Sequence, residues 1–235
     1  MADTLQKEMT MSADAAKILE FLQVIGNNGP MRVVYMSFGS LFWPSEPAKV
    51  WAFIDVLLEK KIPFIFSHGS PYSSVPENVV DKVKHSGLGL VTRWAPQQTV
   101  LAHPAVGWFV THAGFNSVTE AVVNGVPMIC WPFAVDQPIN AVHLTQNLDV
   151  AYELFEVRTG EHGLKQIHHT KRAPIGTPNA VREEAVAILD KAFGDDGARK
   201  RTNIKQLREK VLAAWDENGS SRRDVQALVK DMTGI

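Results

Sequence analysis

The amino-acid sequence predicts an α/β domain built on a doubly wound parallel sheet, with further helices at its C-terminal end. Short, mostly apolar runs are typical of strands that a parallel sheet buries on both faces. Segments with apolar residues at helical spacing lie between these runs. Because strands and helices alternate, right-handed crossovers are expected to bring the strands into one sheet.

Five segments have the length and apolar character of buried strands. They are residues 33–38, 62–66, 88–93, 106–111 and 126–131. The first strand is closed by Gly39 and Ser40, and a loop with Pro71 and Pro76 is expected after the second. All five strands therefore precede residue 132.

Eight segments fit helices, several with apolar residues three and four positions apart on one face. They are residues 12–25, 46–60, 96–102, 115–124, 136–147, 179–193, 198–216 and 221–232. Ser12 or Asp14 is suited to cap the first helix, and Gly26 begins the turn that ends it. Residues 156–178 are polar and are expected to form a surface loop.

Composition excludes several classes of protein. The 235 residues are 45% hydrophobic and 21% charged, which is too apolar for a disordered chain. A net charge of -1 provides no general field for binding nucleic acid. The single cysteine, Cys130, excludes an intrachain disulfide and fits a reducing compartment. No signal peptide and no apolar run of about 20 residues is found, so we expect a cytoplasmic protein without a membrane span.

A candidate phosphate site lies where the fourth strand ends. Residues 111–117 lead from a strand through a turn at Gly114 into a helix N-terminus, whose free N–H groups and positive dipole end suit a phosphate. Gly114 would allow close backbone approach, and His112 and Ser117 would add donors. The structural alternative is that Asn116 or Ser117 only caps the helix.

Other polar residues are expected at the same edge of the sheet, where open α/β sheets bind ligands. Glu120 shares a helix face with the phosphate site and could accept hydrogen bonds from two ribose hydroxyls. Asp136 and Gln137 follow the fifth strand and could bind sugar hydroxyls, and Trp94 offers a flat face for a base. Each also has an ordinary interpretation, as a solvated side chain, a helix cap or a core aromatic residue.

The joint spacing of these residues resembles the signature box of UDP-dependent glycosyltransferases, best known from plant secondary-product enzymes. The matching stretch covers residues 94–137 without a gap, and residues 34–40 resemble the start of that family's C-terminal domain. The resemblance implies the C-terminal half of a GT-B fold, in which two Rossmann-like domains face a cleft. Residues 1–29 would then be a connecting segment, and residues 30–235 the Rossmann-like domain that binds the UDP-sugar.

The resemblance also implies roles for single residues. Trp94 would stack on uracil, and the backbone of Ala95 would pair with the base edge. Gln97 and Glu120 would hold the ribose. The diphosphate would be held by Ser40, His112, Gly114, Asn116 and Ser117. Phe115 stands where plant members usually have tryptophan, and it would act through its backbone.

Asp136 and Gln137 would bind the transferred sugar, which Gln137 suggests is glucose. The implied reaction is inverting hexosyl transfer from a UDP-sugar to a hydroxyl of a small lipophilic acceptor. The catalytic base would come from an N-terminal acceptor-binding domain, in cis or in trans, which no segment of this chain resembles. The catalytic residue is therefore unknown, and His68 is the nearest substitute by position. No cofactor and no metal is expected, because the chain lacks an Asp-x-Asp motif.

Three alternatives remain open at this point. One is a nucleotide-sugar-binding module or fragment without activity of its own. Another is a sugar-nucleotide epimerase of the same two-domain architecture. The last is an NAD-dependent enzyme, against which the absence of a G-x-G-x-x-G sequence after the first strand argues.

Overall fold

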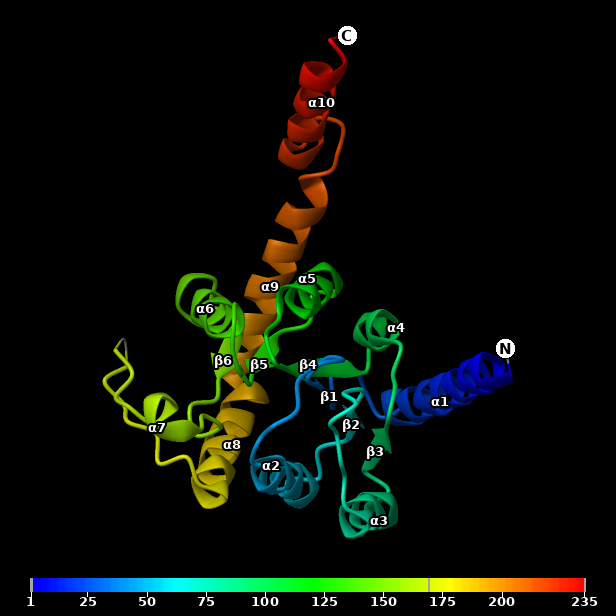
Figure 1. Ribbon diagram of the computed structural model, residues 1–235, viewed down its shortest axis with the longest axis vertical. Helices are drawn as coiled ribbons and strands as arrows, with labels where there is room; N and C mark the ends of the chain where they lie inside the picture. The colour runs from blue at the N-terminus through cyan, green and yellow to red at the C-terminus, as the bar shows by residue number, and fades with distance from the viewer. Residues whose placement is uncertain (1, 169, 235) are drawn as a thin grey trace.

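The computed structural model describes residues 2–168 and 170–234, with side chains from residue 13 onward. Its six strands form one parallel sheet in the order β3-β2-β1-β4-β5-β6 (Figure 1). They are β1 (Val33–Ser37), β2 (Phe64–Ser67), β3 (Gly89–Thr92), β4 (Val106–Thr111), β5 (Met128–Cys130) and β6 (Ala151–Glu153). The predicted doubly wound parallel sheet is confirmed. The order reverses between β1 and β4, which makes their carboxyl ends the switch point.

Helices cover both faces of the sheet (Figure 1). They are α1 (Ala2–Gly26), α2 (Ala48–Glu59), α3 (Glu77–Ser86), α4 (Gln97–Ala102), α5 (Phe115–Asn124), α6 (Gln137–Val142), the π-helix η1 (His143–Asn147), α7 (Gly160–Gly163), α8 (Pro178–Ala192), α9 (Asp195–Ala213) and α10 (Ser220–Thr233). The eight predicted helices are present. The predicted helix 136–147 is divided between α6 and η1.

Each face of the sheet has its own apolar core, because successive residues of a strand point to opposite faces. Tyr35 of β1 packs in one core with side chains of α1, α4, α5 and α9. Its neighbours Val34 and Met36 pack in the other core with α2 and α8. The continuous apolar runs of the sequence therefore reflect burial on both faces.

Three local predictions are corrected by the structure. The first helix begins at Ala2, so Asp14 lies inside it and does not cap it; the side chain of Ser12 lies outside the described residues. The carboxylate of Asp14 instead accepts a hydrogen bond of 3.1 Å from the Thr92 hydroxyl and ties α1 to β3. The loop after β2 contains α3, which was missed because only Val83 of this helix is buried. β6 was missed because it has only three residues and ends in Glu153.

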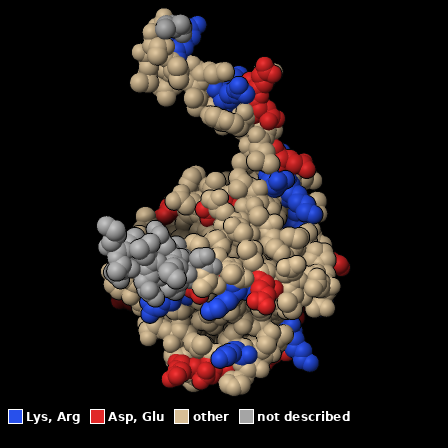
Figure 2. All heavy atoms as spheres, turned by 90° about the vertical axis from the view of Figure 1, so that its right-hand side faces the viewer, with Lys and Arg blue, Asp and Glu red and all other residues tan. Residues whose placement is uncertain are grey.

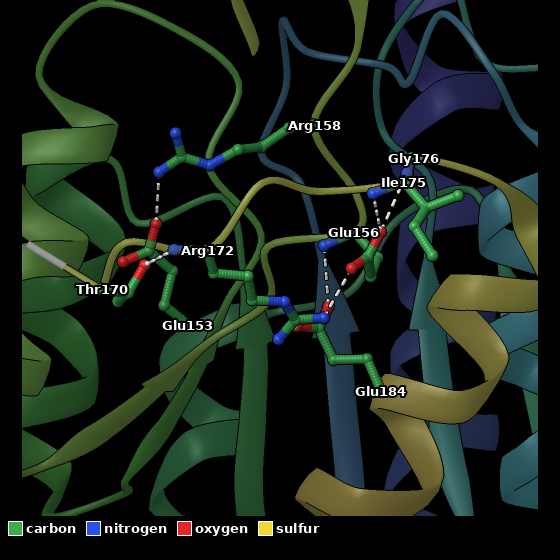
Figure 3. Close-up of polar contacts among 8 residues, drawn as sticks. All are labelled: Glu153, Glu156, Arg158, Thr170, Arg172, Ile175, Gly176 and Glu184. Carbon is green, nitrogen blue, oxygen red and sulfur yellow. Dashed lines mark hydrogen bonds and ion pairs between the residues drawn. The ribbon is translucent and has the colours of Figure 1, made fainter. Parts of the chain in front are cut away.

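The segment after β6 is more ordered than its polar composition predicts. Glu156 accepts hydrogen bonds from the amides of Ile175 and Gly176, at 2.7 and 2.8 Å, and from Arg172 at 2.5 Å (Figure 3). Arg172 also donates to Glu184 of α8 at 2.9 Å. Both carboxylates are buried, and burial raises the pKa of Glu184. These contacts tie Glu156 and residues 172–176 to each other and to α8.

The end of α9 and all of α10 project from the body of the domain (Figures 1 and 2). No described residue of α10 is buried. Exposed apolar side chains on this extension are Val211, Leu212, Trp215, Val225, Leu228, Val229 and Met232. Acidic and basic side chains are interspersed on the face shown in Figure 2. Within the described ranges, no helix is both long and apolar enough to cross a membrane.

Candidate functional site

A pocket of about 380 Å³ opens at the switch point of the sheet. Ser37 of β1 and Thr111 of β4 are paired in register, so the turns after these two strands lie side by side. The pocket is lined by Gly39, Ser40, Leu41, Phe42, His112, Gly114, Phe115, Asn116, Ser117, Asp136 and Gln137. All of the residues predicted to hold the diphosphate and the sugar therefore line this one pocket.

The turn between β4 and α5 exposes a helix N-terminus to this pocket. Ala113 adopts a left-handed conformation with a φ of 62°, and its amide donates to the Thr111 hydroxyl at 3.3 Å. Gly114 is the N-cap of α5. The amides of Asn116 and Ser117 make no hydrogen bond within the described part of the chain. These free donors and the helix dipole are suited to an anion, so this turn is a candidate anion site.

His112 is held between two glycines. A Cβ atom on Gly39 would lie 3.0 Å from Cε1 of the ring, and one on Gly114 would lie 2.5 Å from Nε2. Gly114 has an ordinary φ of -65°, so its lack of a side chain serves the contact with His112 rather than an unusual backbone conformation. Burial lowers the pKa of His112, while the Asp136 carboxylate acts in the opposite direction. The ring is therefore neutral at pH 7 and carries one N–H donor.

Beside the anion site, side-chain amides fix the carboxylate of Glu120. Nε2 of Gln97 donates to Glu120 at 2.6 Å and to the Ser117 hydroxyl at 3.0 Å. Gln98 donates to the other Glu120 oxygen at 3.1 Å. The buried hydroxyl of Tyr35 donates to Oε1 of Gln97 at 3.3 Å, which orients the Gln97 amide. Tyr35 and Gln98 were not predicted as site residues.

Asp136 and Gln137 are placed differently from each other. Asp136 is exposed, and its Oδ2 accepts from the amide of Phe115 at 3.3 Å. Gln137 is only 2% exposed, and its Oε1 accepts from the amides of Phe133 and Ala134 at 2.8 and 3.2 Å. Because Oε1 of Gln137 is already occupied by these two amides, only its Nε2 remains to bind a sugar hydroxyl.

Trp94 and Ala95 do not line this pocket. Trp94 is half-buried in the turn between β3 and α4, and its carbonyl accepts from the Thr92 hydroxyl at 3.0 Å. Two residues later, Gln97 joins this turn to Ser117 of α5. The residues predicted to bind the base are therefore connected to the pocket through the Gln97 side chain.

Two other features of the domain lie away from the switch-point pocket. A larger cavity of about 660 Å³ lies between β6 and α8. It is not at the switch point, and no residue of α5 lines it. His68 is half-buried beside Trp43 and Phe66, and its Nδ1 lies 3.0 Å from the Ser73 hydroxyl. Burial, assisted by Arg93, lowers the pKa of His68 to about 4. His68 does not line the 380 Å³ pocket, so it is not placed to act on a ligand there.

The edge around the pocket is apolar as well as open. Leu41, Phe115, Val135 and Ile139 follow three different strands, and each is at least 69% exposed. Isolated exposed apolar residues are common, but Leu41 and Phe115 line the pocket, and exposed apolar side chains grouped at a pocket are typical of a binding surface.

The fold and the pocket define a nucleotide-binding domain of the doubly wound α/β class. Comparison of the sequence with known families narrows this class. Residues 8–166 match the family described as UDP-glucoronosyl and UDP-glucosyl transferase, and the chain belongs to this family. The predicted family resemblance is confirmed.

Two curated relatives show how much of a family member the chain represents. It is 39% identical to the UDP-glycosyltransferase eriJ of Hericium erinaceus over 221 residues, which are 92% of this chain and 44% of that protein. It is 34% identical to the anthocyanidin 3-O-glucosyltransferase UFGT of Vitis vinifera over 210 residues, 88% of this chain and 41% of that protein. The chain thus spans less than half the length of these relatives.

Two solved structures likewise match this chain over less than half of their own length. A UDP-glucose: anthocyanidin 3-O-glucosyltransferase in complex with UDP has a TM-score of 0.70 and 30% identity, with coverage of 92% of this chain and 43% of that one. Phytolacca americana UGT2, complexed with UDP-2fluoro-glucose and pterostilbene, has a TM-score of 0.68 and 27% identity, with coverage of 90% and 44%. The chain has the fold of the C-terminal half of a GT-B glycosyltransferase.

Proposed function

We propose that this chain is the donor-binding half of an inverting UDP-glycosyltransferase and binds a UDP-sugar in the pocket at the switch point. The observation that carries the proposal is the N-terminus of α5, where the free amides of Asn116 and Ser117 lie beside His112 and Ser40. Such a site suits a diphosphate. Family membership and the UDP in a related structure support a uridine nucleotide.

In this proposal the predicted contacts with the nucleoside are retained. Trp94 stacks on uracil, and the backbone of Ala95 pairs with the base edge. Gln97 and Glu120 hold the ribose hydroxyls. Support comes from the hydrogen bond between Gln97 and Ser117, since it puts the ribose-binding residues next to the anion site.

The diphosphate is held by Ser40, His112, Asn116 and Ser117 together with the turn at Gly114. The neutral His112 ring donates one hydrogen bond, and the helix end stabilises negative charge on the departing UDP. Within the described ranges, no group of three or more His, Cys, Asp or Glu side chains is placed to hold a metal ion. We propose that the helix N-terminus and these donors bind the diphosphate without a metal ion.

Asp136 and Gln137 bind the transferred sugar, which we propose is glucose, while Phe115 contributes its backbone. Asp136 accepts from sugar hydroxyls, and Nε2 of Gln137 donates to one. The box has no arginine to pair with the carboxylate of a glucuronate. A competition series with UDP-glucose, UDP-galactose, UDP-glucuronate and UDP-N-acetylglucosamine tests this choice, and preference for the glucuronate would refute it.

The acceptor and the catalytic base belong to a second domain in our proposal. Residues 30–235 form the donor domain, and residues 1–29 connect it to an N-terminal acceptor-binding domain, in cis or in trans. The apolar edge at Leu41, Phe115 and Ile139 suits a small lipophilic acceptor and that domain. A cytoplasmic location is proposed with it, on the basis that the one cysteine is free and buried.

An NAD-dependent enzyme is the alternative that strand order alone would favour. The turn after β1 lacks the glycine sequence that cradles a dinucleotide, and α2 begins only at Ala48, so its N-terminus does not follow β1 directly. The free helix N-terminus at the pocket belongs instead to α5. An inactive binding module and an epimerase share the proposed donor site and differ only in what a second domain adds.

Calorimetric titration of the chain with UDP, ADP and NAD tests the proposal. We expect UDP to bind more tightly than ADP or NAD, and we expect EDTA to leave the affinity unchanged. Tighter binding of NAD, or loss of UDP binding in EDTA, would sink the assignment.

A further inference from the structure

We propose that Asn140 is a positioning residue for the donor sugar and holds the Asp136 carboxylate in the orientation that binds the transferred hexose. Asn140 is not among the residues predicted from the sequence. The inference rests on the proposed function, because it takes Asp136 as a sugar-binding residue. Asn140 itself acts through Asp136 and does not need to touch the sugar.

The contact begins with the first turn of α6. Asp136 is the N-cap of this helix, and Asn140 lies one turn later, with its backbone amide donating to the Asp136 carbonyl at 2.9 Å. Nδ2 of Asn140 donates to Oδ2 of Asp136 at 2.8 Å and to the carbonyl of Ala113 at 2.9 Å. Both partners can only accept, so the Asn140 side chain must present its NH₂ group to them.

This arrangement leaves one oxygen of Asp136 for a ligand. Oδ2 accepts from both Asn140 of α6 and the amide of Phe115, the first residue of α5. Among the described residues, none donates a hydrogen bond to Oδ1. Asp136 is exposed and lines the pocket. The protein therefore fixes the carboxylate by one oxygen and leaves the other to accept a sugar hydroxyl.

The same side chain joins the two halves of the donor site. Ala113 lies in the turn before the anion site, and its φ of 62° is unusual for a residue other than glycine. By bonding the Ala113 carbonyl, Asn140 ties α6 to the turn after β4. The distance between the sugar-binding carboxylate and the diphosphate-binding amides is thereby held constant.

A purely structural role makes a different prediction from a positioning role. If Asn140 only braced two loops, its loss would lower stability and weaken UDP and UDP-glucose equally. If it positions Asp136, its loss affects the sugar selectively and only while Asp136 is present. The effects of two coupled residues are then not additive.

The chain provides a matched control at the opposite edge of the sheet. Nδ2 of Asn203 donates to the carbonyl of Asp149 at 3.0 Å and to its carboxylate at 3.1 Å. Asp149 has a positive φ of 50°, like Ala113. Asn203→Ala therefore removes the same two kinds of hydrogen bond, but it does so before β6 and away from the donor pocket.

The test is calorimetric titration of the full chain with UDP and with UDP-glucose, combined with thermal unfolding. Asn140→Ala should weaken UDP-glucose roughly three- to tenfold more than UDP, the effect of about one ordinary hydrogen bond. Asp136→Ala should show a selective loss at least as large, and adding Asn140→Ala to it should give no further selectivity. Asn203→Ala should leave the ratio of the two affinities unchanged.

Equal weakening of both ligands by Asn140→Ala would overturn the inference, as would a selective loss that adds to that of Asp136→Ala. These outcomes leave the proposed function intact as long as the wild-type chain binds both ligands. If the wild-type chain binds neither ligand, the proposed function fails and the inference fails with it.

Discussion

Single residues of the proposed site are held by partners that have no sequence signature of their own. Spacing along the chain predicts Gln97, Ser117 and Glu120, because the family box fixes their positions. Tyr35, which orients Gln97, lies in an apolar strand and is indistinguishable from a core residue in the sequence. Gln98 is an ordinary exposed helix residue until Glu120 of another helix is placed beside it. Such supports depend on tertiary contacts that no local pattern encodes.

Removing the ribose acceptor should affect all uridine nucleotides alike. Glu120→Ala is expected to weaken UDP and UDP-glucose by similar factors, of about one to two decades, since a hydrogen bond to a charged group contributes roughly 1.5–3 kcal/mol. Gln98→Ala leaves the carboxylate in place and should cost much less. Calorimetry of both variants with both ligands measures this, and a loss confined to UDP-glucose would show that Glu120 contacts the sugar instead.

The half-buried His68 should make the domain less stable in acid. The pKa of His68 is lowered to about 4 by burial and by Arg93, so between the unfolded value of about 6.5 and pH 4 the unfolded chain binds a proton that the folded chain does not. The free energy of unfolding should therefore fall as the pH falls through this window, by on the order of 1–2 kcal/mol after solvent screening.

Urea unfolding at pH 7 and pH 5 tests the assignment of this loss. His68→Gln removes the titrating group and should lose less stability than the wild-type chain between these two values. The assignment to His68 fails if the wild-type and variant chains lose the same amount.

Among secondary-structure elements, those with one clear apolar period were predictable and those without it were not. The stripe of α2 buries Val50, Phe53 and Leu57, as its spacing predicts. In α3 only Val83 is buried, so its charged composition hid the helix. The short β6 is recognisable only from its pairing with β5. Trp215 has helical spacing from Ile204 but is 59% exposed, because α9 leaves the body of the domain.

The projecting helix α10 should contribute little to the stability of the domain. Deleting residues 219–235 is expected to shift the unfolding temperature by less than about 2 °C and to leave UDP affinity unchanged, because α10 buries no described side chain. A deletion that begins at residue 203 removes Ile204, which is fully buried, and should lower the unfolding temperature markedly. A large loss from the shorter deletion would mean that α10 packs on the domain in solution.

At the scale of the whole molecule, the parallel sheet and the family could be predicted from the sequence. The position of the largest described cavity, away from the candidate site, could not. Alternation of strands and helices predicted the crossovers, and the 44-residue box predicted which sheet edge binds the ligand. That the larger cavity lies elsewhere, between β6 and α8, depends on the fold of residues 151–200. The chain also spans only 44% and 41% of the length of the two curated relatives described above.

The chain alone should bind donor but transfer sugar poorly or not at all. In our proposal the second domain positions the acceptor, and positioning of two reactants can lower the reaction barrier by roughly 7–11 kcal/mol. The same domain supplies a general base, which raises the rate by about 10²–10⁴-fold. The assay is transfer from UDP-glucose to phenolic and sterol-like acceptors, with and without an added N-terminal domain. Robust turnover by the chain alone, if it were lost in His68→Gln, would place the catalytic base within this chain and not in a second domain.

The central claim is that UDP binds at the switch point of the sheet, and a crystal structure of the chain with UDP tests it most directly. We expect the diphosphate on the amides of Asn116 and Ser117, the ribose beside Glu120, and uracil on Trp94. UDP bound in the 660 Å³ cavity between β6 and α8, with the N-terminus of α5 unoccupied, would contradict the account.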